Sequence, residues 1–271
     1  MCGRAGHHAT THDPEDATVT ELPVSFRIPS PIERDLLLWV VRQRPAPEAA
    51  ARGTVLYIHG ATFPSGLAVG FKFDDVSWTD DLARSGFDVW AFDFLGYGGS
   101  SRYREMNQAP TAHGPLGRTP IAYEQIAAVV SFVRTQTGCD RLHLLAHSWG
   151  TQPTALFASR HPLQVERLVL FAPILRRELP NLPKPESIPA YRFWTVDEQW
   201  GRFVEDVPKS HPPVLLKRHF ERWAPAYLET DRESMTRNPP AVMTPTGPRR
   251  TYWQAGRARC PMNPAKSAPR H

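Results

Sequence analysis

Cysteine is scarce in this sequence. The 271 residues contain three cysteines, Cys2, Cys139 and Cys260. Their spacings are too long for a zinc site, and their odd number does not fit a disulfide framework. A reducing compartment is the simplest interpretation, so we predict a cytoplasmic protein without a bound metal.

Long apolar runs are missing as well. No stretch approaches the roughly 20 apolar residues that a membrane-spanning helix needs. Residues 1–18 are polar and lack the apolar centre of a secretory signal, so we expect a disordered leader there. Its histidines, His7, His8 and His12, are interpreted as part of that leader and not as a metal cluster. We therefore predict no association with a membrane.

Acidic residues are absent from the stretch 241–271, which contains six Lys or Arg. The whole chain has a net charge of +5, so the part before this stretch is near neutral. A basic tail can bind nucleic acid or another acidic surface. However, no recognisable nucleic-acid-binding module accompanies it, and we expect no nucleic-acid partner. We interpret 241–271 as a basic, Pro-rich tail.

Apolar residues are abundant enough for a folded domain. They make up 41% of the chain, which includes 8 Trp and 13 Phe, and this excludes an intrinsically disordered protein. A chain of this length can bury a sizeable core as one domain, with room for an insertion.

Short apolar strands alternate with amphipathic helices in the first two thirds of the chain. Strands are predicted over 21–28, 35–43, 53–58, 87–94, 142–145 and 165–172, and helices over 76–84, 119–137 and 150–160. We expect Thr119 to cap the long helix and Gly138 to end it. The strand over 165–172 is apolar enough to be buried on both faces. This alternation predicts a mostly parallel α/β sheet with right-handed crossovers.

The composition changes after Pro173. Residues 175–240 are rich in Pro, Arg and Trp, with two helical pieces over 196–207 and 214–228. After Leu228 we expect no strand of the buried kind, because the best fragments, 241–243 and 251–253, are short. The predicted organisation is therefore a core over 19–174, a helical lid over 175–240 and the tail over 241–271.

A sharp strand-to-helix turn is predicted at Ser148. The stretch 141–150 reads RLHLLAHSWG, in which a short apolar strand ends at a serine and helix-compatible sequence follows. A serine at the apex of such a turn is a nucleophile elbow, usually written G-x-S-x-G. The tight turn requires small neighbours, and here they are Ala146 and Gly150.

Three further motifs lie in a fixed order around this elbow. One strand ends in His59-Gly60, another in Asp93 followed by the glycine-rich turn 96–100, and a third in Phe171-Ala172-Pro173. Together with the elbow they resemble the α/β-hydrolase superfamily, in its large group of general α/β-fold serine hydrolases with an inserted lid. The resemblance implies a mostly parallel sheet with helices on both faces, a helical lid and no cofactor. The Ser-Trp-Gly of the elbow is also similar to that of proline iminopeptidases, which does not decide the substrate.

The resemblance also implies roles for single residues. Ser148 would be the nucleophile that forms an acyl-enzyme with a small ester, amide or similar acyl substrate. The backbone N–H groups of Trp149 and Ala61 would form the oxyanion hole. The Trp149 indole would line the acyl pocket. Aromatic residues of the lid that could close it are Trp194, Trp200 and Trp223.

The remaining two members of the triad are not found. The family order places an acid and then a histidine after the nucleophile, on strands that this sequence does not contain. The segment 256–266 resembles the approach to the strand that bears the acid. We interpret the sequence as a truncated or frameshifted product that lacks the last two strands. An open sheet edge then predicts instability or aggregation.

Other residues are weak substitutes for the missing base and acid. The remaining histidines near the motifs, in the predicted lid and in the tail are His59, His143, His147, His211, His219 and His271. Asp93 is interpreted as an anchor of the glycine-rich turn, and Glu178 is the one acid placed where some family members carry theirs. The turn 96–99 lacks the spacing of a dinucleotide site.

Two hypotheses of different classes follow. The first is a serine hydrolase whose activity is weak or absent because the chain is incomplete. The alternative is a non-catalytic α/β-hydrolase-like protein that binds a ligand under its lid or a partner through its open edge. The sequence leaves the substrate and the oligomeric state open.

Overall fold

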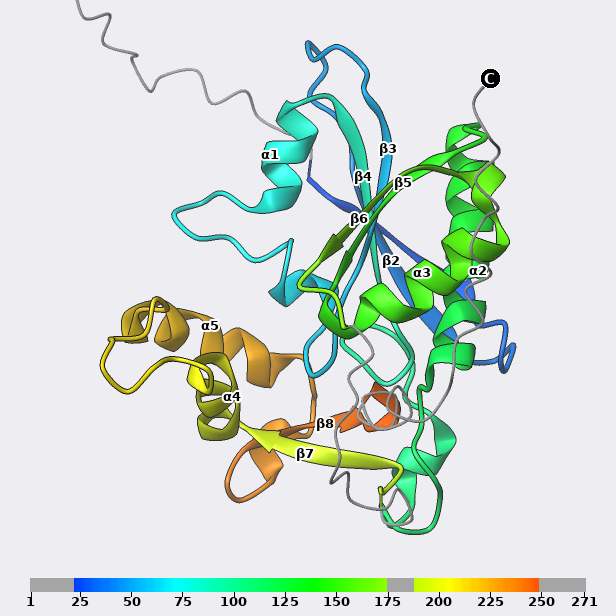
Figure 1. Cartoon of the computed structure of the whole chain (residues 1–271). Helices are drawn as coiled ribbons and strands as arrows, with labels where there is room; N and C mark the ends of the chain where they lie inside the picture. The colour runs from blue at the N-terminus through cyan, green and yellow to red at the C-terminus, as the bar shows by residue number, and fades with distance from the viewer. Residues whose placement is uncertain (1–21, 175–187, 249–271) are drawn as a thin grey trace, which may run out of the picture.

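The computed structural model describes residues 22–174 and 188–248 (Figure 1). Its centre is a six-stranded sheet with the order β1-β2-β4-β3-β5-β6. The strands are β1 (Val24–Pro29), β2 (Leu37–Gln43), β3 (Gly53–Ile58), β4 (Phe87–Asp93), β5 (Leu142–His147) and β6 (Val165–Phe171). The predicted strands are confirmed, with ends that shift by up to three residues.

The sheet is mixed. β1 pairs with β2, and β2 with β4, in antiparallel register. β4, β3, β5 and β6 pair in parallel. Parallel neighbours need crossover connections, which the predicted helices provide. The carboxyl ends of β3, β4 and β5 therefore meet at one edge of the sheet, where the sequence motifs lie.

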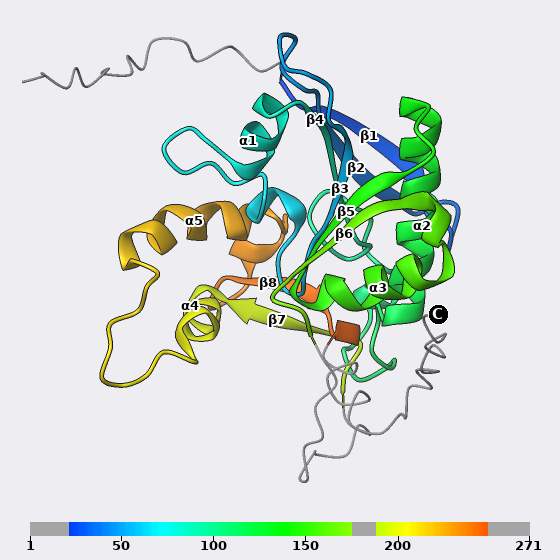
Figure 2. The same cartoon turned by 45° about the horizontal axis from the view of Figure 1, so that its top comes forward.

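Helices cover both faces of the sheet (Figures 1 and 2). α2 (Thr119–Thr137) and α3 (Thr151–Arg160) lie together on one face, over the largest core cluster. α2 ends at Gly138, whose φ of 71° is the left-handed conformation predicted for that position. The predicted N-cap at Thr119 was wrong: Arg118 precedes the helix with an extended backbone and makes no side-chain cap.

α1 (Trp78–Arg84) lies on the opposite face of the sheet. A capping box fixes its start, because Ser77 and Asp80 each bond the other's backbone N–H. A short helix with a satisfied N-terminus is enough to cover part of β4, and Ala83 is buried there.

β6 does not have the burial that its sequence predicted. Its apolar side chains from Leu168 to Phe171 are exposed, including Phe171 at 52% and Val169 at 53%. The expectation of a strand buried on both faces was wrong because β6 is the last strand of the described sheet and has a neighbour only on its β5 side. An apolar strand at a sheet edge is a surface on which other chains can pair.

Residues 188–248 form a second layer, which we call the β7/β8 subdomain. It contains the antiparallel pair β7 (Tyr191–Thr195) and β8 (Ala241–Pro245), with α4 (Val196–Val204) and α5 (Lys217–Glu229) between them. The two helices were predicted. The expectation that no buried strand follows Leu228 was wrong, because every residue of β8 is buried against β7 and its surroundings.

The β7/β8 subdomain packs at the end of the sheet towards which the parallel strands point (Figure 2). Gly247 donates its N–H to the Leu116 carbonyl, and Pro245 lies against Gly96 of the glycine-rich turn. Its aromatic residues largely pack on one another and on the segment after β3. Short 3₁₀ turns complete the fold at Ser65–Leu67, Arg104–Asn107, Ser148–Gly150, Pro162–Gln164 and Ser234–Thr236.

Among the described helices, none combines the length and apolar character that crossing a bilayer requires.

Candidate active site

Ser148 occupies the apex of a sharp turn between β5 and α3. Its φ is 52°, in the left-handed region that residues other than glycine rarely adopt. The 3₁₀ turn Ser148–Gly150 starts directly at the end of β5 and continues into α3. Strain of this kind persists only where the surroundings impose it, and it is typical of a nucleophile elbow. The predicted turn is therefore present.

The neighbours of the elbow explain which small residues it needs. A Cβ at Gly150 would overlap the carbonyl oxygen of His59, so only glycine fits there. A Cβ at Gly60 would lie 2.9 Å from the Cβ of Ser148, so the segment after β3 approaches the serine closely. Ala146 points into the main core and is fully buried. Its methyl group has space there, which accounts for alanine where the usual pattern has glycine.

His59 is a fixed structural residue beside the elbow. Its Nε2 accepts the N–H of Phe94 at 3.0 Å, so Nδ1 carries the proton and donates to the Gly60 carbonyl at 2.7 Å. Burial lowers the pKa of His59, against the opposing effect of Asp93. Because both ring nitrogens are engaged, His59 holds the segment after β3 against β4 and is not available as a general base.

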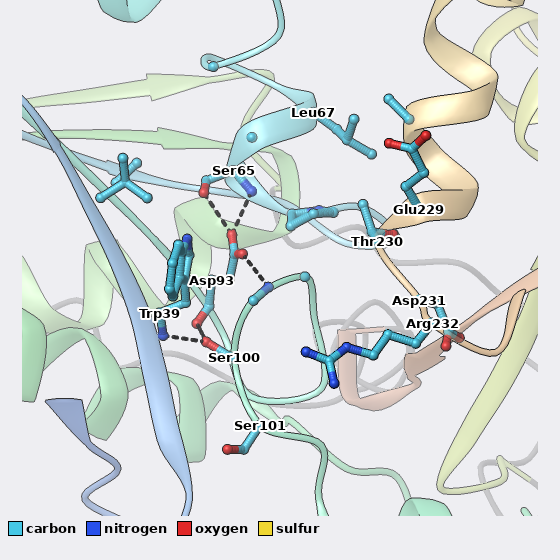
Figure 3. A pocket seen from close by; sticks show the side chains of 18 of the residues that line it. Trp39, Ser65, Leu67, Asp93, Ser100, Ser101, Glu229, Thr230, Asp231 and Arg232 are labelled. Carbon is cyan, nitrogen blue, oxygen red and sulfur yellow. Dashed lines mark hydrogen bonds between the residues drawn. The ribbon is translucent and has the colours of Figure 1, made fainter. Parts of the chain in front are cut away.

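Asp93 anchors two loops at the end of β4 (Figure 3). One carboxylate oxygen accepts the backbone N–H of Ser65 at 2.9 Å and its hydroxyl at 2.7 Å. The other accepts the N–H of Gly99 at 3.0 Å. The interpretation of Asp93 as a structural anchor is thus supported by its hydrogen bonds. The role of Ser65 was missed, since no spacing in the sequence marks it.

Ala61 directly follows Gly60, and Trp149 directly follows Ser148; the role of their backbone N–H groups as oxyanion donors stays a prediction. The Trp149 indole is buried in the main core, with its ring 5.5 Å from that of Phe94. The sequence predicted that this indole lines an acyl pocket, but it packs in the core instead. The predicted lid residue Trp223 is also buried, in the cluster at the centre of the β7/β8 subdomain.

No base is positioned at Ser148 within residues 22–174 and 188–248, where no side chain hydrogen-bonds to its hydroxyl. His147 packs its ring 5.4 Å from that of Phe171, and burial lowers its pKa. His143 lies against Phe87. The ring of His219 lies 5.5 Å from that of Phe73, and Nδ1 of His211 lies 2.9 Å from the hydroxyl oxygen of Ser210.

The acid candidate Glu178 and the terminal His271 lie outside the described residues, as does the basic part of the tail beyond residue 248. In the part of the chain that is described, no group of three or more His, Cys, Asp or Glu could hold a metal ion.

A groove of about 1110 Å³ lies beside the Asp93 anchor but does not include Ser148. Figure 3 shows Trp39 on its β2 side and Glu229, Thr230, Asp231 and Arg232, from the end of α5 and the segment after it, on the other. Because Ser148 does not line this groove, we do not identify it as the catalytic pocket in spite of its size.

Comparisons with known proteins agree with this fold. A family model described as the alpha/beta hydrolase fold matches residues 53–256. The Arabidopsis thaliana protein named probable lysophospholipase BODYGUARD 2 is 30% identical over 137 residues, which cover 50% of this chain and 26% of that protein. The match thus spans about a quarter of the plant protein.

One solved structure supports the same fold, and a second is similar over a smaller part of the chain. The thioesterase domain from the curacin biosynthetic pathway superposes with a TM-score of 0.53 at 18% identity, covering 89% of this chain and 75% of that one. A probable hydrolytic enzyme from Pseudomonas aeruginosa gives a TM-score of 0.47 at 23% identity, covering 76% and 60%. The sheet order, the strained serine turn and the family match lead to one conclusion: this chain belongs to the alpha/beta hydrolase fold family.

Proposed function

We propose that this protein is a serine hydrolase that cleaves an ester-type acyl bond with Ser148 as the nucleophile and without a cofactor. The observation that carries the proposal is the left-handed conformation of Ser148, pressed against Gly60 at the carboxyl end of β5. A strained serine held by close backbone contacts is costly to maintain, and such strain is concentrated at functional sites.

The reaction would follow the acyl-transfer scheme. The Ser148 hydroxyl oxygen attacks the carbonyl carbon of the ester while its proton passes to a base. The N–H groups of Trp149 and Ala61 stabilise the oxyanion that forms. The alcohol then leaves with a proton, and water releases the acid from the acyl-enzyme. Each oxyanion donor contributes roughly 3–4 kcal/mol in such sites.

We expect slow turnover, because the described residues supply no base at Ser148. Without a functioning triad, the oxyanion hole and substrate binding alone retain a residual acceleration of about 10³–10⁴ over water. A site without a proton acceptor would be slow in both acylation and deacylation. An acyl-enzyme that forms would therefore persist.

The substrate class is a small carboxylic ester. The name of the plant relative, a probable lysophospholipase, supports an ester over an amide. The β7/β8 subdomain lies at the carboxyl ends of the strands, where an inserted lid would cover the substrate. We propose that it acts as that lid in a cytoplasmic enzyme.

Reaction with a fluorophosphonate probe tests this function. The folded protein is expected to form a covalent adduct that Ser148→Ala abolishes. Ser159→Ala is the matched control, because Ser159 is an exposed serine in α3, and it is expected to label as the parent does. A soluble, folded sample that forms no adduct would refute the hydrolase.

The exposed β6 favours a second candidate, a non-catalytic family member that binds a partner chain along this edge. Val169 and Phe171 present apolar side chains next to an unpaired strand edge in the described sheet. This candidate predicts no fluorophosphonate adduct, together with a binding partner that is lost when Val169 is replaced by Lys.

A further inference from the structure

Thr62 has an unfavourable backbone conformation beside the proposed oxyanion donor. It follows Ala61 directly, and its φ is 75°. β-Branched residues rarely adopt this left-handed conformation, which costs about 1–3 kcal/mol. Thr62 is nevertheless buried. Its surroundings must therefore hold it in place.

Two residues of α4 contact Thr62. Arg202 donates from Nη1 to the Thr62 hydroxyl oxygen at 2.6 Å. That hydroxyl donates in turn to Oε1 of Gln199 at 3.5 Å, and Nε2 of Gln199 lies 3.5 Å from the Thr62 carbonyl oxygen. Both ends of the threonine, side chain and backbone, are thus contacted by one helix.

Gln199 and Arg202 are themselves fixed in place. Gln199 is fully buried, and its Nε2 donates to the Tyr227 hydroxyl at 2.9 Å. Arg202 donates to Oε1 of Gln199 at 3.2 Å and lies over the ring of Trp194, 4.9 Å from its centroid. A buried polar group that is fully paired is costly to displace. Moving α4 away from Thr62 would therefore break hydrogen bonds of a buried glutamine as well as that of Arg202.

The rest of this loop is held on both sides. Asp93 binds Ser65 from the sheet. From the β7/β8 subdomain, the rings of Phe203 and Trp223 lie 5.8 and 5.5 Å from that of Phe63. Thr62 directly follows Ala61 in the sequence. The hydrogen bonds from the β7/β8 subdomain to Thr62 are therefore made next to the proposed oxyanion donor.

We infer that Arg202 and Gln199 are positioning residues for the oxyanion hole: they hold Thr62 in its left-handed conformation and thereby fix the direction of the Ala61 N–H. This inference rests on the proposed function. It makes the docked β7/β8 subdomain a requirement for the acylation step, in addition to any role in covering the substrate.

Arg202→Met tests the inference through two readouts, the rate of fluorophosphonate labelling at Ser148 and amide hydrogen exchange in a peptide spanning residues 59–66. We expect labelling about tenfold slower, less than the hundredfold or more that follows loss of an oxyanion donor. Exchange in this peptide is expected to rise while exchange in the strands of the central sheet is unchanged. Arg202→Lys, which retains a donor, is expected to recover part of the rate.

Arg222→Met is the matched control. Arg222 also joins the subdomain to the segment after β3, through an ion pair with Asp74 at 3.1 Å, but it does not contact Thr62. It is expected to label at the parental rate. Thr62→Val removes the hydroxyl that Arg202 binds, so the double variant with Arg202→Met is expected to be no slower than the slower single variant.

The outcomes separate the two proposals. Unchanged exchange over residues 59–66 in Arg202→Met overturns the inference whether or not the protein labels, and so does an equal rise in Arg222→Met. Normal labelling of Arg202→Met overturns the catalytic consequence. A folded parent that forms no Ser148 adduct refutes the proposed function, and the positioning role with it, even if exchange responds as expected.

Discussion

β5 and β6 are adjacent parallel strands of similar apolar character in very different surroundings. Their residues pair from His143 with Arg167 to His147 with Phe171. Leu144 is 1% exposed, whereas its register partner Leu168 is 39% exposed. β5 has a strand on each side, and β6 has only β5 within the described sheet. An apolar strand is buried only if neighbours are present to bury it.

This difference divides the molecule into two parts. The elbow, the Gly60 segment and the Asp93 anchor are all built on β3, β4 and β5, which the sheet encloses. Among residues 22–174 and 188–248, no base or acid of a triad lies at Ser148. The described part of the site therefore lies on the β3 and β4 side of Ser148.

The largest effect is expected from truncating the two register partners. Leu144→Ala should lower the free energy of unfolding by about 3 kcal/mol, because it leaves a cavity in a packed core. Leu168→Ala should cost less than about 1 kcal/mol, since its side chain already contacts water. Urea unfolding measures both values. Equal losses of unfolding free energy for the two variants would show that β6 is covered in solution. They would contradict the difference in burial between β5 and β6.

The elbow itself should tolerate no added methyl group. Gly150→Ala would push a Cβ into the His59 carbonyl, and we expect it to cost about 2 kcal/mol or more. Gly201→Ala is the control, because a Cβ at Gly201 in α4 meets no atom within 4 Å. It should be neutral or stabilise the protein by up to about 1 kcal/mol. An unchanged stability of Gly150→Ala would mean that the turn leaves room for a Cβ beside the His59 carbonyl.

A smaller effect is expected from acidification. The pKa values of His59 and His147 are lowered from 6.5, mainly by burial. Below pH 6.5 the unfolded chain therefore binds more protons than the folded protein does. The contribution of these two histidines to stability is fully present above that pH and is lost as the pH falls below it. Unfolding in urea should require less denaturant at about pH 5.5 than at about pH 7.5. His147→Gln should reduce this difference between the two pH values. An unchanged difference would show that His147, at its contact between β5 and β6, does not contribute to the pH dependence of stability.

The smallest effect on stability is expected at the exposed strand. Val169→Lys should change the free energy of unfolding by less than about 0.5 kcal/mol, because this side chain is half exposed. It should reduce self-association, since a charge on an edge strand opposes pairing with another chain. Light scattering over a concentration series measures this. Strong destabilisation without a change in association would show that Val169 is packed inside the protein.

Most of the sheet could be predicted from the sequence because its signals are local. Period-two and continuous apolar runs located β1 to β6, and the turn residues around Ser148 located the elbow. β8 could not be found in this way, since Ala241–Pro245 is short and is stabilised by pairing with β7, about fifty residues earlier.

The burial of side chains and the contacts between distant segments also could not be predicted from the sequence. The exposure of β6 depends on which strands flank it, and the packing of Trp149 depends on Phe94, which follows β4. Arg202 and Gln199 carry no motif, and their contact with Thr62 joins segments about 140 residues apart. The turn at Ser148 could be predicted because its signal lies in consecutive residues. The residues that support the segment beside this turn come from distant parts of the chain.

The most direct measurement of the central claim is the mass of the acyl-enzyme. The protein is incubated with an activated ester, quenched in acid and digested with trypsin, which releases the peptide 142–160. This peptide contains two serines, Ser148 and Ser159, and fragmentation distinguishes them. We expect one acyl group on Ser148 that persists because deacylation is slow. Ester hydrolysis with no acyl group on Ser148, or with the group on another residue, would contradict it.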